Sequence, residues 1–156
     1  GLESARIGVL IHPQSIVHAL VEYADGSLIA QLGPPDMRSP IQYALTWPAR
    51  PDGRSRKLDL ESLSRLDFEP PDLARFPALG LAYRAIDEGG TSGAVFNAAN
   101  EEAVHAFLNG VIPFGRIPEL SRRAMDELGV RPLETLDDAL RADAESRRLV
   151  RRWLET

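Results

Sequence analysis

Residues 16–32 read IVHALVEYADGSLIAQL, and this stretch decides the fold of the N-terminal part of the chain. The positions that share one strand face are Val17, Ala19, Val21 and Tyr23. Such alternation is typical of a half-buried strand, and Asp25-Gly26 supplies a turn with a positive φ before the apolar run 28–32 returns. Because an isolated hairpin is only marginally stable, we expect its apolar side chains to need a neighbouring sheet, in the same subunit or across a symmetric interface.

The segments on either side of the hairpin carry further signals. The β-branched run Ile7–Ile11, ended by His12-Pro13, predicts a buried strand. Ser39-Pro40 predicts the start of a helix that Pro48 ends after Trp47. Residues 49–71 are rich in loop residues, which favours a domain boundary or a long strap over the surface.

The rest of the chain has helical periodicity. We predict a helix capped by Asp72 and ended by Gly89-Gly90, with Pro77 as a proline that could shift its start by a turn. Further helices are predicted from Thr91 to Asn109-Gly110, over Glu119–Leu128, after a capping box at Thr135 with Asp138, and from a cap at Asp143. The expected fold class is therefore α+β, with a part that contains the hairpin over residues 1–70 and a small all-helical domain over residues 71–156.

Composition narrows the function classes. The chain has 156 residues, 44% of them hydrophobic and 26% charged, which is ordinary globular composition. A net charge of −5 gives no basic field for nucleic acid or an anionic membrane. The absence of Cys excludes disulfides and thiolate metal sites, and no apolar run approaches the ~20 residues that cross a bilayer. The first residues also lack the basic and then apolar layout of a secretory signal, so we expect a cytoplasmic protein or part of one. Since no initiator Met is present, we expect that the chain begins inside something longer or has been processed.

Three positions near the hairpin are candidates for chemistry. His18 suits a proton shuttle or a partner for a sugar hydroxyl, and the alternative is a structural histidine; it is expected to point away from Val17 and Ala19. Ser15 would bond a ligand amide or close a turn. The loop after the hairpin, with Pro35 and Met37, would present a Pro ring and a thioether to a planar ligand or simply connect two elements.

Other polar clusters favour structural roles. The run Asn97–Glu102 is expected to form hydrogen bonds between helices, and the Arg-rich end, Arg147 to Arg152, to be a solvated helix face rather than a basic patch. The spacing of His12 and His18 matches no metal motif, so no metal ligand is predicted. There is also no Walker loop, GxGxxG or GxSxG sequence.

Several uncommon strings together resemble a known family. They are residues 11–18 (IHPQSIVH), 23–27 (YADGS), 30–33 (AQLG), 35–38 (PDMR), 72–77 (DLARFP) and 97–101 (NAANE). In this order they resemble 1-deoxy-D-xylulose 5-phosphate reductoisomerase, over about Ile7 to Trp153.

The resemblance implies an enzyme of the methylerythritol phosphate route to isoprenoids. That family uses NADPH and a Mg or Mn ion to convert 1-deoxy-D-xylulose 5-phosphate to 2-C-methyl-D-erythritol 4-phosphate. By resemblance, Ser15, Pro35 and Met37 line the nicotinamide side of the pocket, and His18 sits beside the sugar phosphate substrate. The hairpin region would build a homodimer, and residues 1–70 would be the C-terminal part of the catalytic and dimerisation domain.

The family's dinucleotide-binding domain, acidic metal cluster and phosphate site have no counterpart in this sequence. We therefore expect a fragment that is inactive alone and binds neither NADPH nor the metal ion tightly. The alternative is a non-catalytic dimerisation or scaffold module derived from the same family. A third possibility, an unrelated binder of sugar phosphates, has little support because no phosphate-cradling loop is present.

Overall fold

The computed structural model describes residues 2–155 and divides the chain into two compact units. One unit, called here the hairpin unit, is Val9–Pro71. The other, the helical unit, combines the residues up to Gly8 with those from Asp72 onward. A change of unit near residue 70 was expected, whereas the return of the first residues to the helical unit was not. Each unit is described by itself.

The hairpin unit is built on two antiparallel strands, β1 (Val17–Glu22) and β2 (Leu28–Leu32). Gly26 has φ +82°, and its N–H donates to the Tyr23 carbonyl at 2.9 Å. The turn therefore needs the left-handed conformation that glycine adopts readily. The predicted hairpin is confirmed.

A β-bulge interrupts the hairpin at His18. Val17 pairs with Leu32, but the next pair along the ladder is Ala19 with Gln31, so His18 is an extra residue on β1. An extra residue shifts the strand face on which its neighbours lie. The strict alternation predicted through this position is therefore wrong there.

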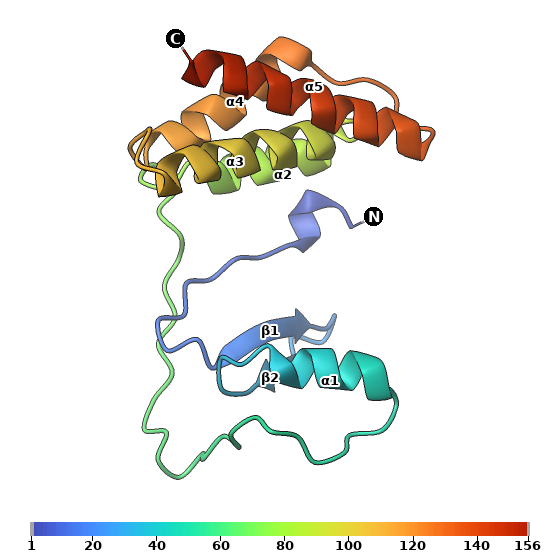
Figure 1. Ribbon diagram of the computed structural model, residues 1–156. Coiled ribbons are helices and arrows are strands. Elements are labelled where there is room, and N and C mark those ends of the chain that lie inside the picture. Colours follow the sequence, from blue (N-terminus) through green and yellow to red (C-terminus); the bar gives the residue numbers. More distant parts are fainter. Residues whose placement is uncertain (1, 156) are drawn as a thin grey trace. The chain divides into compact units, whose positions relative to one another are not determined.

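Helix α1 (Arg38–Thr46) follows the loop after β2 (Figure 1). A turn made by Asp36 precedes it, since the Asp36 carboxylate accepts from the Arg38 N–H at 3.0 Å, and Met37 is the N-cap residue. The predicted cap by Ser39 is wrong, since Ser39 already lies inside the first turn. The predicted end of the helix at Trp47-Pro48 is confirmed.

The segments at the two ends of the hairpin unit are extended. The strand predicted over Ile7–Ile11 is wrong: only Ile11 pairs, in an isolated bridge with Glu69, and Leu10 is 54% exposed. The local β propensity of this run has no second strand beside it in residues 2–155. The predicted loop character of residues 49–71, called here the strap, is confirmed, because no helix or strand forms there apart from that bridge.

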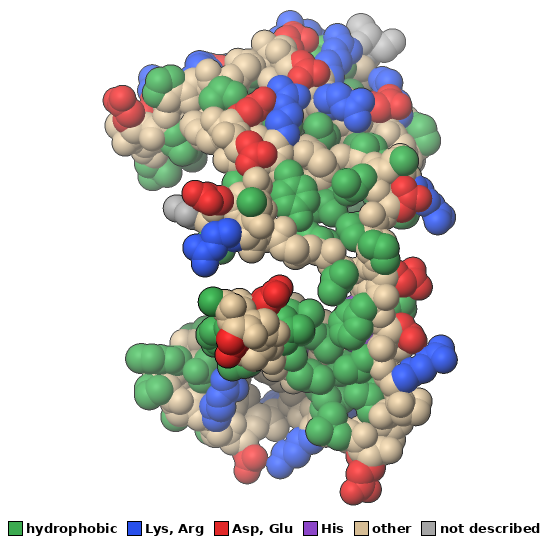
Figure 2. Space-filling model, turned by 180° about the vertical axis from the view of Figure 1, so that it is seen from behind, with side chains coloured by type: hydrophobic (Ala, Val, Ile, Leu, Met, Phe, Trp, Pro, Cys, Tyr) green, Lys and Arg blue, Asp and Glu red, His purple; other side chains and the backbone are tan. Residues whose placement is uncertain are grey.

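The sheet of the hairpin unit carries many exposed apolar side chains. Val21 is 53% exposed and Ile29 is 60% exposed, although both lie in paired strands. Figure 2 shows such apolar groups spread over the surface of this unit. Within residues 2–155 the two-stranded sheet has no third strand. The expectation that the hairpin needs a covering partner therefore stands.

The helical unit consists of a short 3-10 turn and four helices. They are η1 (Ser4–Arg6), α2 (Ala78–Glu88), α3 (Ser92–Leu108), α4 (Arg116–Leu128) and α5 (Leu136–Leu154). Helix α3 packs against the three other helices, and the Tyr83 hydroxyl donates to the Ile7 carbonyl at 2.9 Å, which fixes the N-terminal segment to α2. None of the helices described is long and apolar enough to span a bilayer.

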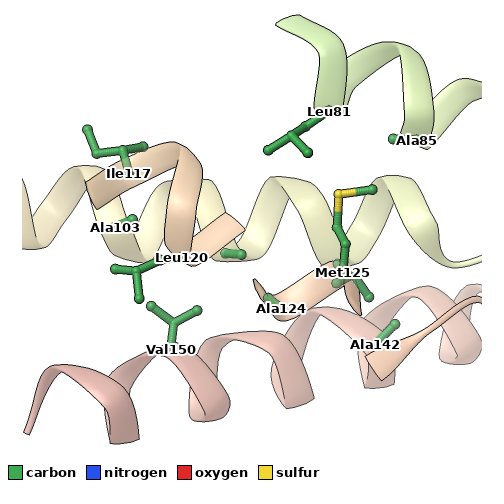
Figure 3. Close-up of a cluster of buried hydrophobic side chains, with 11 residues drawn as sticks. Leu81, Ala85, Ala103, Ile117, Leu120, Ala124, Met125, Ala142 and Val150 are labelled. Atoms are coloured by element: carbon green, nitrogen blue, oxygen red, sulfur yellow. The ribbon is translucent and has the colours of Figure 1, made fainter. Parts of the chain in front are cut away.

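The core of the helical unit lies along α3. Small side chains on this helix, such as Ala99 and Ala103, are fully buried and allow the neighbouring helices to approach closely. Figure 3 shows Leu120 of α4 directed toward Val150 of α5. The Ser146 hydroxyl donates to the Val95 carbonyl at 2.9 Å inside this core, so its polar group is satisfied.

Three predicted helix starts of this unit differ from the structure. Asp72 caps a separate single turn, accepting from the Ala74 and Arg75 N–H groups, and α2 begins only after Pro77, the proline expected to shift its start. Helix α4 begins at Arg116 rather than at the predicted Glu119. Asp143 begins no helix: α5 runs unbroken from Leu136, and the Asp143 carboxylate instead accepts from Arg147 at 2.7 Å. The predicted capping box of Thr135 with Asp138 is confirmed.

An ion-pair network joins α3 to α5. Glu102 accepts from Arg151 at 2.6 and 2.8 Å and from Arg147 at 3.3 Å, and Arg147 also pairs with Glu101. The polar run on α3 therefore has the predicted inter-helix role, through its two Glu residues. Two arginines of the Arg-rich end are held in this network rather than forming a basic patch.

Candidate functional site

His18 is anchored to the loop that follows the hairpin. Its Nε2 lies 3.0 Å from the Gly33 carbonyl oxygen. Because a carbonyl oxygen only accepts, Nε2 carries the proton, and in this tautomer Nδ1 presents a lone pair. The ring is exposed, so Nδ1 is available as a proton or hydrogen-bond acceptor. The bulge at His18 is the backbone feature that directs this side chain to the loop.

Ser15 lies at the entry to β1 in a conformation that is unusual for serine. Its φ is +50°, and its N–H closes a turn by donating to the His12 carbonyl at 3.0 Å. Within the described residues the Ser15 hydroxyl makes no hydrogen bond, and the residue is exposed. The backbone of Ser15 therefore closes a turn, while its exposed hydroxyl stays available to a ligand.

The loop from Gly33 to Met37 is rigid. The Gly33 N–H donates to the Ile16 carbonyl at 2.9 Å, which extends the hairpin ladder, and the Asp36 N–H donates to the Pro34 carbonyl at 2.8 Å, which closes a tight turn around Pro35. Met37 follows at the start of α1 with 70% of its surface exposed.

Asp36 fastens this loop to α1. Its two carboxylate oxygens accept from the guanidinium of Arg38 at 2.6 to 2.9 Å. These hydrogen bonds hold the pKa of Asp36 well below its usual range. The carboxylate is therefore ionised at neutral pH and is occupied by its own neighbour, which explains it without a metal ion.

The structure connects the predicted site residues at one end of the hairpin. His18 bonds to Gly33, Gly33 bonds to the residue after Ser15, and Pro35 and Met37 follow in the same loop. The end of the hairpin thus carries an acceptor nitrogen, a hydroxyl and exposed apolar groups. Such a surface can bind one face of a planar, partly polar ligand, but it encloses no cavity by itself.

No metal site forms among the described residues. Among the described residues, no three His, Asp or Glu side chains lie close enough to hold a metal ion together. The described residues therefore do not fit the divalent ion that the family resemblance implies.

Residues of the strap support the turn that contains Ser15, and sequence reasoning missed them. Gln14 Nε2 donates to Asp67 Oδ2 at 2.5 Å, and the Asp67 N–H donates back to Gln14 Oε1 at 3.2 Å. His12 Nδ1 donates to the Asp67 carbonyl at 2.7 Å, and its ring stacks on Phe68 with centroids 4.7 Å apart. Since Gln14 and Asp67 are 53 residues apart, no local pattern indicates this pairing.

Comparison with known proteins identifies relatives along almost the whole chain. The family described as "DXP reductoisomerase C-terminal domain" matches residues 32–149. A 1-deoxy-D-xylulose 5-phosphate reductoisomerase from Nitrosospira multiformis is 50% identical over 96% of this chain, which spans 38% of that relative's length. One from Burkholderia multivorans is 54% identical, and the chain spans 37% of its length.

Solved structures give the same result. A 1-deoxy-D-xylulose 5-phosphate reductoisomerase from Zymomonas mobilis in complex with NADPH superposes with a TM-score of 0.86 at 44% identity, over 96% of this chain and 39% of that one. A DOX-P reductoisomerase in complex with NADPH, fosmidomycin and magnesium has a TM-score of 0.85 at 37% identity, over 94% of this chain and 38% of that one. The fold described above, from the hairpin to the last helix, is thus shared with these enzymes, and the chain belongs to the DXP reductoisomerase C-terminal domain family.

Proposed function

We propose that this chain forms the C-terminal part of a homodimeric, cytoplasmic reductoisomerase that converts 1-deoxy-D-xylulose 5-phosphate to 2-C-methyl-D-erythritol 4-phosphate with NADPH. The observation that carries the proposal is the bond from His18 Nε2 to the Gly33 carbonyl, which joins the hairpin to the Pro35–Met37 loop. The relatives of this chain are named as reductoisomerases, which supports this function over that of a non-catalytic dimerisation module.

The proposed role of this chain is to supply one wall of the pocket. Met37 and Pro35 would lie against the nicotinamide ring, since an exposed thioether and a flat Pro ring suit a planar aromatic surface. Ser15 would donate its hydroxyl proton to the carboxamide of that ring. NADPH, when bound, would supply the hydride. The residues of this chain would hold the nicotinamide ring in place and exclude water from the face of the ring that they cover.

His18 would act on the substrate. With the Nε2 proton held on the Gly33 carbonyl, Nδ1 accepts a hydrogen bond from a substrate hydroxyl and so positions it. Asp25 and Asp36 would take no part, because Asp25 accepts from Ser27 and Asp36 from Arg38. The ligands of the Mg or Mn ion would come from outside the described residues.

The test of the NADPH wall uses Met37→Ala in the full-length enzyme. Loss of part of an apolar contact of this size lowers affinity by about 1 kcal/mol, so the Kd for NADPH should rise about fivefold with the KM for the sugar phosphate unchanged. Leu45→Ala is the matched control, because Leu45 is an 82% exposed apolar residue on α1 of the same unit. A rise in the substrate KM alone would remove Met37 from the NADPH wall.

The test of His18 is His18→Gln, which preserves a donor for Gly33 but removes the ring acceptor. We expect kcat to fall by about 10²-fold, the lower range for a positioned acid–base group, with the same circular dichroism spectrum. Unchanged kinetics would make His18 a purely structural residue.

The proposed homodimer rests on the exposed sheet. A second copy of the chain would cover the apolar side chains of β1 and β2, of which Val21 and Ile29 are more than half exposed. Ile29→Glu should therefore shift the full-length enzyme from dimer to monomer in sedimentation equilibrium, whereas Leu45→Glu on α1 should not. A dimer that survives Ile29→Glu would place the interface elsewhere.

A further inference from the structure

Ser15 is held in a conformation that serine adopts rarely. Among residues 2–155 it is the one non-glycine residue with a positive φ, at +50°. The left-handed region brings the Cβ of an L-residue close to the following carbonyl oxygen, so the surroundings must stabilise it. The residue lies directly before the hairpin, where the predicted nicotinamide contact begins.

The surroundings that hold Ser15 are on the strap. Two residues of the turn from His12 to Ser15 bond to Asp67. Gln14 bonds to the Asp67 carboxylate and backbone N–H, and His12 bonds to the Asp67 carbonyl. Ile11 and Glu69 add a pair of backbone bonds at 2.8 and 2.9 Å. The turn from His12 to Ser15 is therefore fixed to the strap through side chains on both sides of Pro13.

Packing makes this attachment stiff. The His12 ring stacks on Phe68 with an interplanar angle of 17°, and its Nε2 is buried, with no hydrogen-bond partner in the described part of the chain. A ring with one nitrogen bonded and the other enclosed has no alternative orientation of equal energy. The attachment thus restricts the backbone that leads into Ser15.

We infer that Asp67 and Gln14 are positioning residues for NADPH binding, because they hold Ser15 in the left-handed conformation that directs its hydroxyl toward the nicotinamide carboxamide. The inference rests on the proposed function; Asp67 belongs to the strap, whereas Gln14 belongs to the turn that ends at Ser15. Arg65 also contacts the Asp67 carboxylate, at 3.1 Å, but its side chain is 78% exposed and reaches it from solvent. Arg65 is therefore not part of the positioning pair.

The experiment compares five variants of the full-length enzyme, Ser15→Ala among them, by fluorescence titration with NADPH and by steady-state kinetics. Asp67→Ala and Gln14→Leu should each raise the Kd for NADPH about tenfold, since a displaced contact weakens binding steeply with distance. Asp67→Asn should stay within about twofold of the parent, because its amide oxygen still accepts from Gln14. Arg65→Ala should also stay within about twofold, as expected for an exposed pair.

The outcomes separate the inference from the proposed function. Ser15→Ala tests the proposed contact itself, and an unchanged Kd for NADPH would overturn that contact and the inference with it. A raised Kd in Ser15→Ala with unchanged values in Asp67→Ala and Gln14→Leu would overturn the inference alone. If Asp67→Ala does not fold, Gln14→Leu decides: an unchanged Kd for NADPH in this variant, with a raised Kd in Ser15→Ala, would overturn the inference. An Asp67→Asn enzyme as weak as Asp67→Ala would also overturn it, since position would then not be the cause.

Discussion

Replacement of Glu102 by Gln is expected to lower the free energy of unfolding of the helical unit by about 2 kcal/mol at pH 7. The carboxylate is 10% exposed and accepts two short hydrogen bonds from Arg151, at 2.6 and 2.8 Å, and a longer one from Arg147. A hydrogen bond to a charged group contributes about 1.5–3 kcal/mol. Because Arg151 is 60% exposed and Arg147 retains Asp143, neither guanidinium is left buried and unpaired, so the total stays near the lower part of this range.

The same replacement has a defined pH dependence. The hydrogen bonds from Arg151 lower the pKa of Glu102 below its ordinary value of 4.5. A carboxyl group whose pKa is lower in the folded state stabilises it fully above the unfolded pKa, and this contribution is lost as pH falls through the folded pKa. Since Gln does not titrate, the difference between parent and variant should be constant above about pH 5 and shrink below it.

The assay is urea unfolding followed by fluorescence of Trp153, which packs against the core of the helical unit. Both proteins carry Trp47→Phe, because Trp47 belongs to the hairpin unit and would add a second signal. Glu101→Gln is the control: Glu101 is 49% exposed and pairs with Arg147 at the surface, so a loss of less than about 0.5 kcal/mol is expected. Equal losses for the two variants, or a Glu102 effect that persists in acid, would refute the reasoning.

Three further predictions concern the core, a cap and the turn. Leu120→Ala, at a side chain 2% exposed, should lower the stability of the helical unit by about 3 kcal/mol in the same urea assay, whereas Leu108→Ala, at a position 72% exposed, should have almost no effect. Hydrogen bonds from Thr135 lower the pKa of Asp138 to about 2, so Asp138→Asn should destabilise α5 at neutral pH, with a difference in thermal unfolding that disappears as pH falls from about 4 to about 2. Gly26→Ala should speed amide hydrogen exchange in the paired strands about tenfold, because φ +82° disfavours an L-residue by about 1–2 kcal/mol; Gly8→Ala, where φ is not positive and the space is open, should not.

Local patterns predicted the elements whose causes are local. The hairpin follows from alternation on both sides of Asp25-Gly26, and the start of α5 follows from the capping box of Thr135 with Asp138. The predicted break at Asp143 was wrong for a physical reason. A carboxylate can cap a helix or pair with an Arg four residues on, and without Gly or Pro in Leu136–Leu154 the continuous helix is the more stable choice.

The features that shape the candidate site depend on distant residues. The bulge at His18 is a mismatch in register between two strands, and neither strand shows it alone. The support of Ser15 by Asp67 comes from a strap that has no periodic pattern. The residue types in the hairpin therefore predicted the candidate site residues, whereas the positions of these side chains could be described only from the folded structure.

Burial was the least predictable property. The run Ile7–Ile11 and the strands of the hairpin are apolar enough to be core, yet most of these side chains are exposed in the described chain. An alternating apolar pattern predicts that one face of a strand is buried, but it does not indicate which polypeptide buries that face. The same side chains are thus the basis of the proposed dimer.

A crystal structure of the full-length enzyme with NADPH tests the central claim most directly, through the distances from the nicotinamide to Met37 and Ser15. We predict that the Met37 thioether lies in van der Waals contact with the ring, at about 4 Å, and that the Ser15 hydroxyl lies within hydrogen-bond reach of the carboxamide. A nicotinamide bound elsewhere, with both side chains facing solvent or a different ligand, would contradict the assignment of the hairpin and its loop to the cofactor pocket.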